Sequence, residues 1–134
     1  MVKMNKKSFA LFCYPWDIID EGYDAIIDAV KRSGLNSIYV TVNYHSGMFF
    51  LPHSKKRKIY FPEPGALYFN PSSWHKNHTF QSPISNLTEN WPKFWEELSN
   101  KCKQNNINLC AWMLGTHNSG IGNKYQEISV HNAW

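Results

Sequence analysis

The chain has 134 residues, of which 43% are hydrophobic and 18% are charged. These proportions are typical of a globular protein and exclude an intrinsically disordered chain. No run approaches the roughly 18 apolar residues that a membrane span requires. The N-terminus lacks the small-residue cleavage site of a signal peptide, and the three cysteines form no C-x-x-C pattern. We therefore expect a cytoplasmic protein without disulfides.

The net charge of +4 comes largely from the N-terminal lysines and from the run Lys55-Lys56-Arg57-Lys58. Such a run is typical of nuclear-localisation signals and nucleic-acid patches. No stacking aromatic residue is interleaved with these four charges, and no nucleic-acid-binding motif is visible. We interpret the run as a solvated loop and expect neither a nucleic-acid nor a membrane partner.

The first secondary structure expected is a buried strand over residues 9–14, whose exit is Trp16-Asp17. Asp20 is expected to cap the helix that follows. Gly34 supplies the left-handed residue that ends this helix. Its buried face is predicted from apolar residues at helical spacing, namely Tyr23, Ile26, Ile27 and Val30.

The central stretch of the sequence is residues 37–47, which begins as a strand and ends in Tyr44-His45-Ser46-Gly47. Both faces of the strand carry β-branched or aromatic residues, which is typical of a parallel strand covered on both sides. A strand, a helix and a second strand within this distance predict a βαβ unit. Because ligands bind beyond the C-terminal ends of parallel strands, we expect Tyr44 and His45 to contact a ligand.

Residues 51–86 contain five prolines and no helical periodicity. A connection of this length in a compact domain is usually functional or disordered. Its many aromatic residues favour order, so we predict a long loop that forms part of a pocket wall. Glu63 lies within it.

A second helix is expected to be capped by Asn90, with Pro92 in its first turn and Asn105-Asn106 at its end. A strand over residues 107–114 follows and leads into His117-Asn118. No helix or strand is expected from residue 115 to the C-terminus. The buried stripe of the helix is predicted as Trp91, Phe94, Trp95, Leu98 and Cys102.

Three blocks of this sequence resemble the N-terminal part of glycoside-hydrolase-like (β/α)8 barrels. The blocks are Tyr44-His45-Ser46-Gly47-Met48, Pro52-His53 through to Tyr60-Phe61-Pro62-Glu63-Pro64-Gly65, and His117-Asn118-Ser119. The strand with His-x-Gly at its end is also similar to α-L-fucosidase barrels. Here Tyr44-His45 stands in place of the histidine pair of those barrels, and Ser46 stands in place of the following aspartate.

The resemblance implies an α/β fold in which residues 1–134 are a single domain. That domain would be a partial (β/α)8 TIM barrel, with about the first three strands and two helices. It implies that the catalytic acids lie on later strands of a longer barrel.

Glycoside hydrolysis requires two facing carboxyl groups, and Asp17, Glu63 and Glu127 form no evident pair. We therefore expect a truncated glycoside hydrolase that binds carbohydrate and is inactive alone. The high aromatic content, with six tryptophans, fits the packing of sugar C–H groups on flat rings. No metal or cofactor is expected. The predicted substrate-binding residues are His45, His117, Asn118, Tyr44, Trp16, Asp17, Glu63 and Trp112.

Two alternatives remain open at this point. One is a complete small α/β binding module. The other is a metal-dependent hydrolase that uses its histidines, although His53, His75 and His78 do not have zinc-site spacing. In either case, a narrow parallel sheet has open edges, through which we expect self-association.

Overall fold

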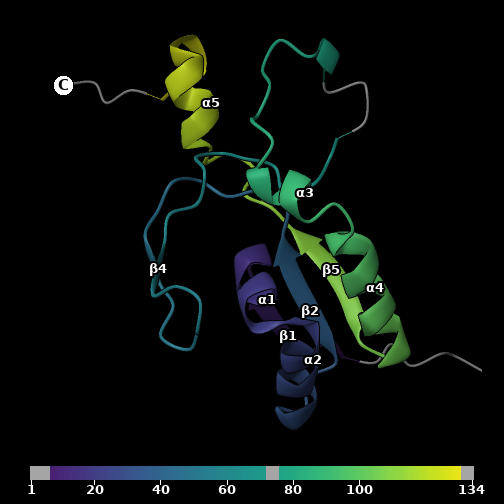
Figure 1. Ribbon diagram of the computed structural model, residues 1–134. Coiled ribbons are helices and arrows are strands. Elements are labelled where there is room, and N and C mark those ends of the chain that lie inside the picture. The colour runs from purple at the N-terminus through teal and green to yellow at the C-terminus, as the bar shows by residue number, and fades with distance from the viewer. Residues whose placement is uncertain (1–6, 72–75, 131–134) are drawn as a thin grey trace, which may run out of the picture. The chain divides into compact units, whose positions relative to one another are not determined.

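A computed structural model describes residues 7–71 and 76–130 of the chain (Figure 1). The chain divides into two compact units. Unit 1 contains the described residues up to Thr41 together with Lys93–Trp112, and unit 2 contains Val42–Pro92 and the described residues from Met113 onward.

Unit 1 is built on a three-stranded sheet of β1 (Ala10–Cys13), β2 (Ser37–Thr41) and β5 (Asn108–Trp112). Both pairs of neighbours are parallel, and the strand order is β1-β2-β5. This confirms the predicted α/β class and the three predicted strands. The sheet is open, because β1 and β5 each pair on one side only.

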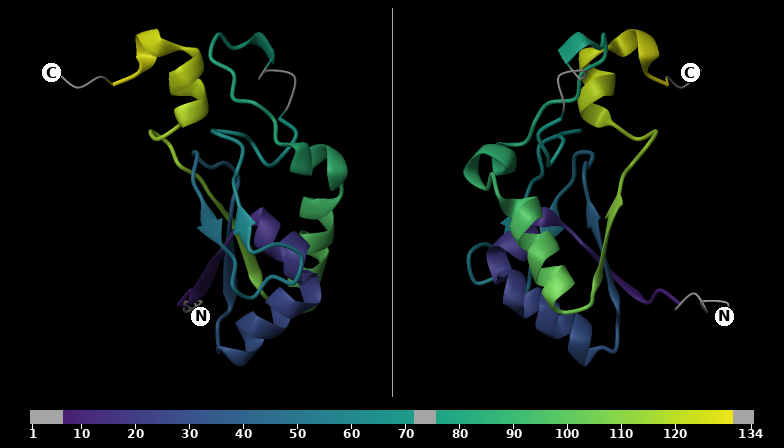
Figure 2. Two further views of the ribbon diagram at one scale, coloured as in Figure 1. Left: turned by 60° about the vertical axis from the view of Figure 1, so that its left-hand side comes forward. Right: turned by 90° about the vertical axis from the view of Figure 1, so that its right-hand side faces the viewer.

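Three helices, α1 (Pro15–Glu21), α2 (Tyr23–Arg32) and α4 (Phe94–Gln104), lie on the same face of this sheet (Figure 2). The apolar stripe of each helix faces the strands, so the core of unit 1 forms between the two layers. Its fully buried members include Val30, Ile38, Val40 and Leu98.

The other face of the sheet carries large rings. Phe12 lies beside Tyr39 in the strand register, and Thr41 lies beside Trp112. The Phe12 ring centroid is 5.1 Å from that of Tyr39 and 5.9 Å from that of Trp112. The sequence predicts that both faces of the central strand are covered, and most residues of β2 are buried. Phe12 on β1 is 63% exposed, because α1, α2 and α4 lie on the opposite face of the sheet.

The predicted start of the first helix is wrong. Pro15 begins an unexpected helix, α1, where its fixed φ and missing N–H cost nothing. Asp20 lies inside α1 and is 9% exposed. The residue before α2 is Gly22, with a φ of 94° that a residue with a side chain rarely adopts.

The predicted ends of both long helices are confirmed. Gly34 has a φ of 67°, and the Leu35 N–H donates to the Val30 carbonyl at 3.0 Å, which closes a Schellman motif. Asn106 has a φ of 55° after α4, where the Ile107 N–H donates to the Cys102 carbonyl at 2.9 Å. Asparagine tolerates this region better than other residues with a Cβ.

The predicted N-cap of the second helix, Asn90, is wrong. Asn90 is the last residue of a separate short helix, α3 (Asn86–Asn90), whose N-cap is Ser85. The Ser85 hydroxyl accepts from the Leu87 N–H at 3.2 Å. The longer helix, α4, begins only after Lys93. Of its predicted stripe, Phe94, Leu98 and Cys102 are buried, Trp95 is half-buried and Trp91 is 41% exposed.

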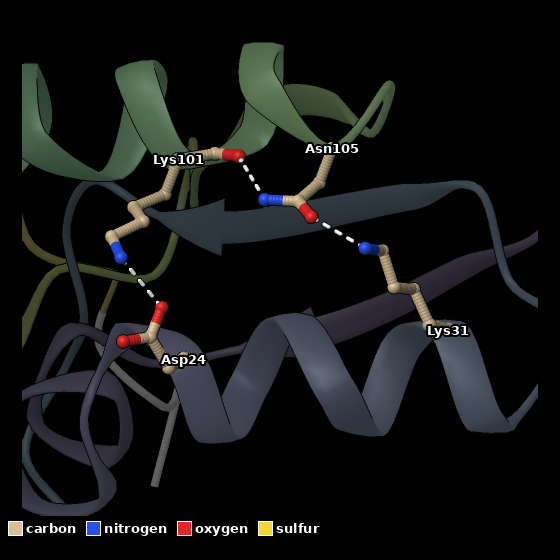
Figure 3. A network of polar contacts seen from close by, with 4 residues as sticks. All are labelled: Asp24, Lys31, Lys101 and Asn105. Carbon is tan, nitrogen blue, oxygen red and sulfur yellow. Dashed lines mark hydrogen bonds and ion pairs between the residues drawn. The ribbon is translucent and has the colours of Figure 1, made fainter.

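Helices α2 and α4 are joined by a polar network on their outer surface (Figure 3). The Lys101 ammonium pairs with Asp24 at 2.6 Å, and the Asn105 amide donates to the Lys101 carbonyl at 2.8 Å. Lys31 in turn donates to the Asn105 side chain. Because Asp24 is 80% exposed, water screens this pair, which aligns the helices more than it stabilises them.

Unit 2 contains a short antiparallel hairpin, β3 (Phe49–Phe50) with β4 (Ile59–Tyr60), and α3. It also contains α5 (Ser119–Lys124) and the 3-10 turn η2 (Gln126–Ile128). These last two elements correct the expectation that the tail has no helix. No described helix of either unit is long and apolar enough to cross a membrane.

Candidate functional site

The predicted residues Tyr44, His45 and His117 form a stack of three rings in unit 2. The His45 and His117 centroids are 4.3 Å apart with the ring planes 7° from parallel. The Tyr44 and His45 centroids are 4.4 Å apart at 24°. His45 is therefore in ring contact with both Tyr44 and His117. His117 is exposed, and it is the member of the stack that a ligand can reach.

Asn43 fixes the backbone next to this stack. It is 5% exposed, and its amide donates to the Leu114 carbonyl at 3.0 Å while its oxygen accepts from the Leu114 N–H at 2.9 Å. The Asn43 side chain thus exchanges two hydrogen bonds with the Leu114 backbone, as two paired strand residues do. Asn43 follows β2 in the chain and Leu114 follows β5, so the pair ties together the two segments that carry His45 and His117.

Two serines beside the histidines add a second tie. The Ser46 N–H donates to the Ser119 hydroxyl at 3.0 Å, and the Ser119 hydroxyl lies 3.1 Å from that of Ser46. No hydrogen bond joins either hydroxyl to a histidine nitrogen among the described residues. The arrangement therefore holds the loops together and does not resemble a nucleophile with its base.

Asn118 has a structural role as well as a place in the site. Its oxygen accepts from the Ile121 N–H at 2.9 Å and so caps α5. Its amide lies 3.3 Å from the Ser82 hydroxyl and 3.4 Å from the Gly65 carbonyl. Asn118 therefore connects the long loop of residues 51–86 to the segment that contains α5.

Gly65 and Gly120 allow the long loop and the segment of α5 to approach each other closely. A Cβ on Gly65 would lie 1.9 Å from the Asn118 oxygen, and a Cβ on Gly120 would lie 2.0 Å from the Pro64 carbonyl oxygen. Both distances are far below van der Waals contact, so only glycine fits at either position. Gly65 also has a φ of 70°.

A pocket of about 840 Å³ opens in unit 2 next to these residues. Two residues of the long loop, Leu67 and Ser82, contribute to its wall. No Asp, Glu, Lys or Arg of the described chain lines it. The polar lining consists of Asn43, Ser82, Thr116, His117, Asn118, Ser119, Asn123, Gln126 and Ser129, and the apolar lining of Leu67, Met113, Leu114, Ile121, Ile128 and Val130, with Gly115 and Gly122.

Glu63, another predicted site residue, holds the start of α3. Its carboxylate accepts from the Ser85 hydroxyl and from the Asn86 N–H, the latter at 2.9 Å. A carboxylate at a helix N-terminus also meets the positive end of the helix dipole. This is a structural role, and a role of Glu63 in ligand binding stays a prediction.

Trp16 and Trp112 belong to unit 1. Trp16 is fully buried and stacks on Tyr14 at 4.6 Å and 11°. Trp112 is half-buried and meets Phe12 and Tyr14 edge to face, with centroids 5.9 Å away in each case. Both rings thus pack against their own unit, and ligand binding by either stays a prediction.

Asp17, also in unit 1, is a carboxyl group with an unusual pKa. Burial raises the pKa of Asp17 from 3.8 to about 6, and repulsion from Glu21 and Asp20 raises it further, while a hydrogen bond from the Tyr14 backbone opposes the shift. The folded state thus holds the Asp17 proton more tightly than the unfolded state does. The contribution of Asp17 to stability is therefore greatest below about pH 4 and is lost as the pH rises through about 6.

Replacing Asp17 by Asn removes the charge and keeps the hydrogen-bond acceptor. We expect Asp17→Asn to raise the free energy of unfolding by about 1 kcal/mol at pH 7, after allowance for partial exposure to water. At about pH 4 the difference should vanish, because the wild-type carboxyl is then largely protonated in the folded state. Urea unfolding of both proteins at the two pH values measures this. A stabilisation that persists unchanged at pH 4 would exclude the titration of Asp17 as its cause.

The described residues contain no cluster of three or more His, Cys, Asp or Glu that could hold a metal ion. The histidine stack is itself a poor chelate. An imidazole binds a metal through a nitrogen lone pair in the plane of its ring, and two rings stacked at 7° do not aim their lone pairs at one point. Of the loop histidines, His75 lies outside the described residues.

Several pocket residues are absent from the sequence prediction, because it expects no helix where α5 and η2 lie. Asn123 and Gln126 are the clearest cases. A usable signal was present, since Ile121, Tyr125 and Ile128 recur at i, i+4 and i+7. The glycines of α5 obscured this periodicity.

No family model, no curated protein and no solved structure matches this chain. The resemblance to glycoside-hydrolase-like and fucosidase-type barrels therefore stays a prediction that rests on the sequence blocks alone.

Proposed function

We propose that the pocket of unit 2 binds an uncharged, hydroxyl-rich ligand of carbohydrate type. The observation that carries the proposal is the composition of the lining, which combines amides, hydroxyls and a histidine with apolar side chains and holds no Asp, Glu, Lys or Arg of the described residues. Charged ligands gain nothing from such a wall. A sugar uses both components, because its hydroxyl groups form hydrogen bonds and its C–H groups pack on apolar surface.

The rigidity of the site supports the same proposal. The stack of Tyr44, His45 and His117, together with the Asn43–Leu114 pair, holds the ring of His117 in place before any ligand arrives. A side chain that is already ordered loses little entropy on binding. Exposed Met113 and Ile128 supply apolar surface in the same wall.

In the fold that we propose for the whole protein, unit 1 forms part of a (β/α)8 barrel. Support comes from the parallel order β1-β2-β5 and from the three helices on one face of the sheet. The likeness of the sequence blocks to glycoside-hydrolase-like proteins also underlies this part of the proposal.

Replacing His117 by Ala should weaken the binding of neutral sugars about tenfold to a hundredfold, which is the usual cost of leaving a hydrogen-bonding partner unpaired. His53→Ala is the matched control, because His53 is also exposed in unit 2 and does not line the pocket. Isothermal titration calorimetry with a panel of neutral mono- and disaccharides measures both variants. The proposal is wrong if no sugar binds, or if the two variants lose the same affinity.

The chain alone should not hydrolyse glycosides. Hydrolysis requires one carboxyl group on each side of the scissile bond, and the pocket wall offers none among the described residues. The measurement is turnover of nitrophenyl glycosides by the purified chain, with Glu63→Gln as the control for a contaminating enzyme. Turnover that disappears in this variant would contradict the claim that the chain only binds.

A further inference from the structure

The hairpin of β3 and β4 and the residues that flank it expose four large apolar side chains. Phe50 pairs with Ile59 across the hairpin, so their side chains project from the same face. Met48 and Phe61 lie just outside the two strands, each two residues along the chain from Phe50 or Ile59. The four side chains are 69% (Met48), 72% (Phe50), 52% (Ile59) and 66% (Phe61) exposed. We call these four residues the hairpin face.

The charge of the protein is concentrated on the same hairpin. Lys55, Lys56, Arg57 and Lys58 lie in the connection between its strands, and residues 48–61 contain no Asp or Glu. The whole chain has 14 basic and 10 acidic residues, so the remainder carries ten of each sign. The net charge of +4 is therefore the charge of this hairpin.

The connection that carries these charges is ordered by hydrogen bonds within the hairpin. The Ser54 hydroxyl is 3% exposed and accepts from the Lys56 and Arg57 N–H groups at 3.2 and 3.3 Å. The Lys58 ammonium donates to the Pro52 and Ser54 carbonyls at 3.0 and 2.8 Å. Arg57 lies 4.8 Å over the ring of Tyr60, which pairs with Phe49 and projects from the face opposite to Phe50 and Ile59.

We propose that this hairpin docks on the surface of an anionic lipid bilayer. The hairpin face enters the boundary between headgroups and acyl chains, and the four cations lie among the lipid phosphates and carboxylates. A patch of this exposure marks an interaction site, and a compact positive charge beside it is complementary to anionic lipids. The proposal is independent of the sugar pocket, since no residue of the hairpin face or of the cationic run lines that pocket.

A bilayer fits these side chains better than a nucleic acid does. Two of the four residues of the hairpin face, Met48 and Ile59, have no ring on which a base could stack. Lys58 and Arg57 are engaged within the hairpin, and the Lys56 ammonium lies 5.9 Å over the Trp91 ring. These cations therefore act through diffuse attraction to a charged surface more readily than through contacts to individual phosphates. The sequence alone does not indicate this surface, because its aromatic residues are not interleaved with the charges and come near them only in the folded hairpin.

The test is sedimentation of the full chain with two kinds of vesicle, phosphatidylcholine alone and phosphatidylcholine with about 30% phosphatidylserine. We expect partition into the anionic vesicles only. Lys55→Gln with Lys56→Gln should lower it about twenty-five-fold, or about fivefold per charge. Phe50→Ser with Phe61→Ser should lower it at least about tenfold. Phe9→Ser and Lys103→Gln are the matched controls, because Phe9 is 56% exposed and Lys103 is exposed, both in unit 1.

Circular dichroism of each variant verifies that it is folded before its partition is compared. The proposal is overturned if the chain does not partition, if it partitions equally into neutral vesicles, or if the hairpin variants behave like the two controls. It is also overturned if a single-stranded oligonucleotide binds the chain more tightly than the anionic vesicles do and with the same dependence on Lys55 and Lys56, because the partner is then a nucleic acid.

Discussion

Replacing Leu98 by Ala is expected to lower the free energy of unfolding of unit 1 by about 2–5 kcal/mol. Leu98 is fully buried on α4. Truncation removes apolar contacts and leaves a cavity, since close-packed neighbours relax only in part. For a domain whose whole stability is typically about 5–15 kcal/mol, this is a large fraction.

Urea unfolding followed by tryptophan fluorescence, to which Trp16, Trp95 and Trp112 of unit 1 contribute, measures the effect. Lys103→Ala is the control, because Lys103 lies on the exposed side of the same helix. We expect this control to remain within about 0.5 kcal/mol of the wild type. A Leu98→Ala protein that loses less than about 1 kcal/mol would show that α4 does not pack on the sheet as described.

The second large effect is expected at Gly65, where an Ala should destabilise unit 2 by about 3 kcal/mol or more. Two costs add here. The φ of 70° is unfavourable for any residue with a Cβ, and the new Cβ would lie 1.9 Å from the Asn118 oxygen. The clash should separate the long loop from α5 and release the Ile121 N–H that Asn118 holds.

Gly34→Ala separates these two costs. Gly34 has nearly the same φ, 67°, and has no atom within 4 Å of an added Cβ. It should therefore show the backbone cost alone, about 1–2 kcal/mol. Amide hydrogen exchange provides the measurement, with loss of protection at Ile121 expected in Gly65→Ala only. Equal protection of Ile121 in both variants would contradict the close approach of Gly65 and Asn118.

Much of unit 1 could be predicted from the sequence because its signals are local. The apolar spacing of Tyr23, Ile26 and Val30 and the ends at Gly34 and Asn106 depend on residues within one or two turns. The wrong caps have a physical reason. Asp20 and Asn90 are good cap residues by type, but each was absorbed into a short helix, α1 or α3, whose own start lies at Pro15 or Ser85.

Unit 2 was harder to predict because distant segments hold it together. Helix α5 contains two glycines and few helix-favouring residues, and it depends on the Asn118 cap and on the fit of Gly120 against Pro64. His45 and His117, in contrast, each come shortly after one of two neighbouring parallel strands, and this pairing brings their rings together. The pocket residues Asn123 and Gln126 could be found only once α5 and η2 were known.

The measurement that tests the central claim most directly is a two-dimensional NMR titration of the chain with the neutral sugars. We expect the side-chain amides of Asn123 and Gln126 and the ring of His117 to shift together, because all three line one pocket. The side-chain amide of Asn100, exposed on α4, should remain unchanged. Shifts confined to residues outside the pocket, or no shifts with any sugar, would contradict carbohydrate binding at this site.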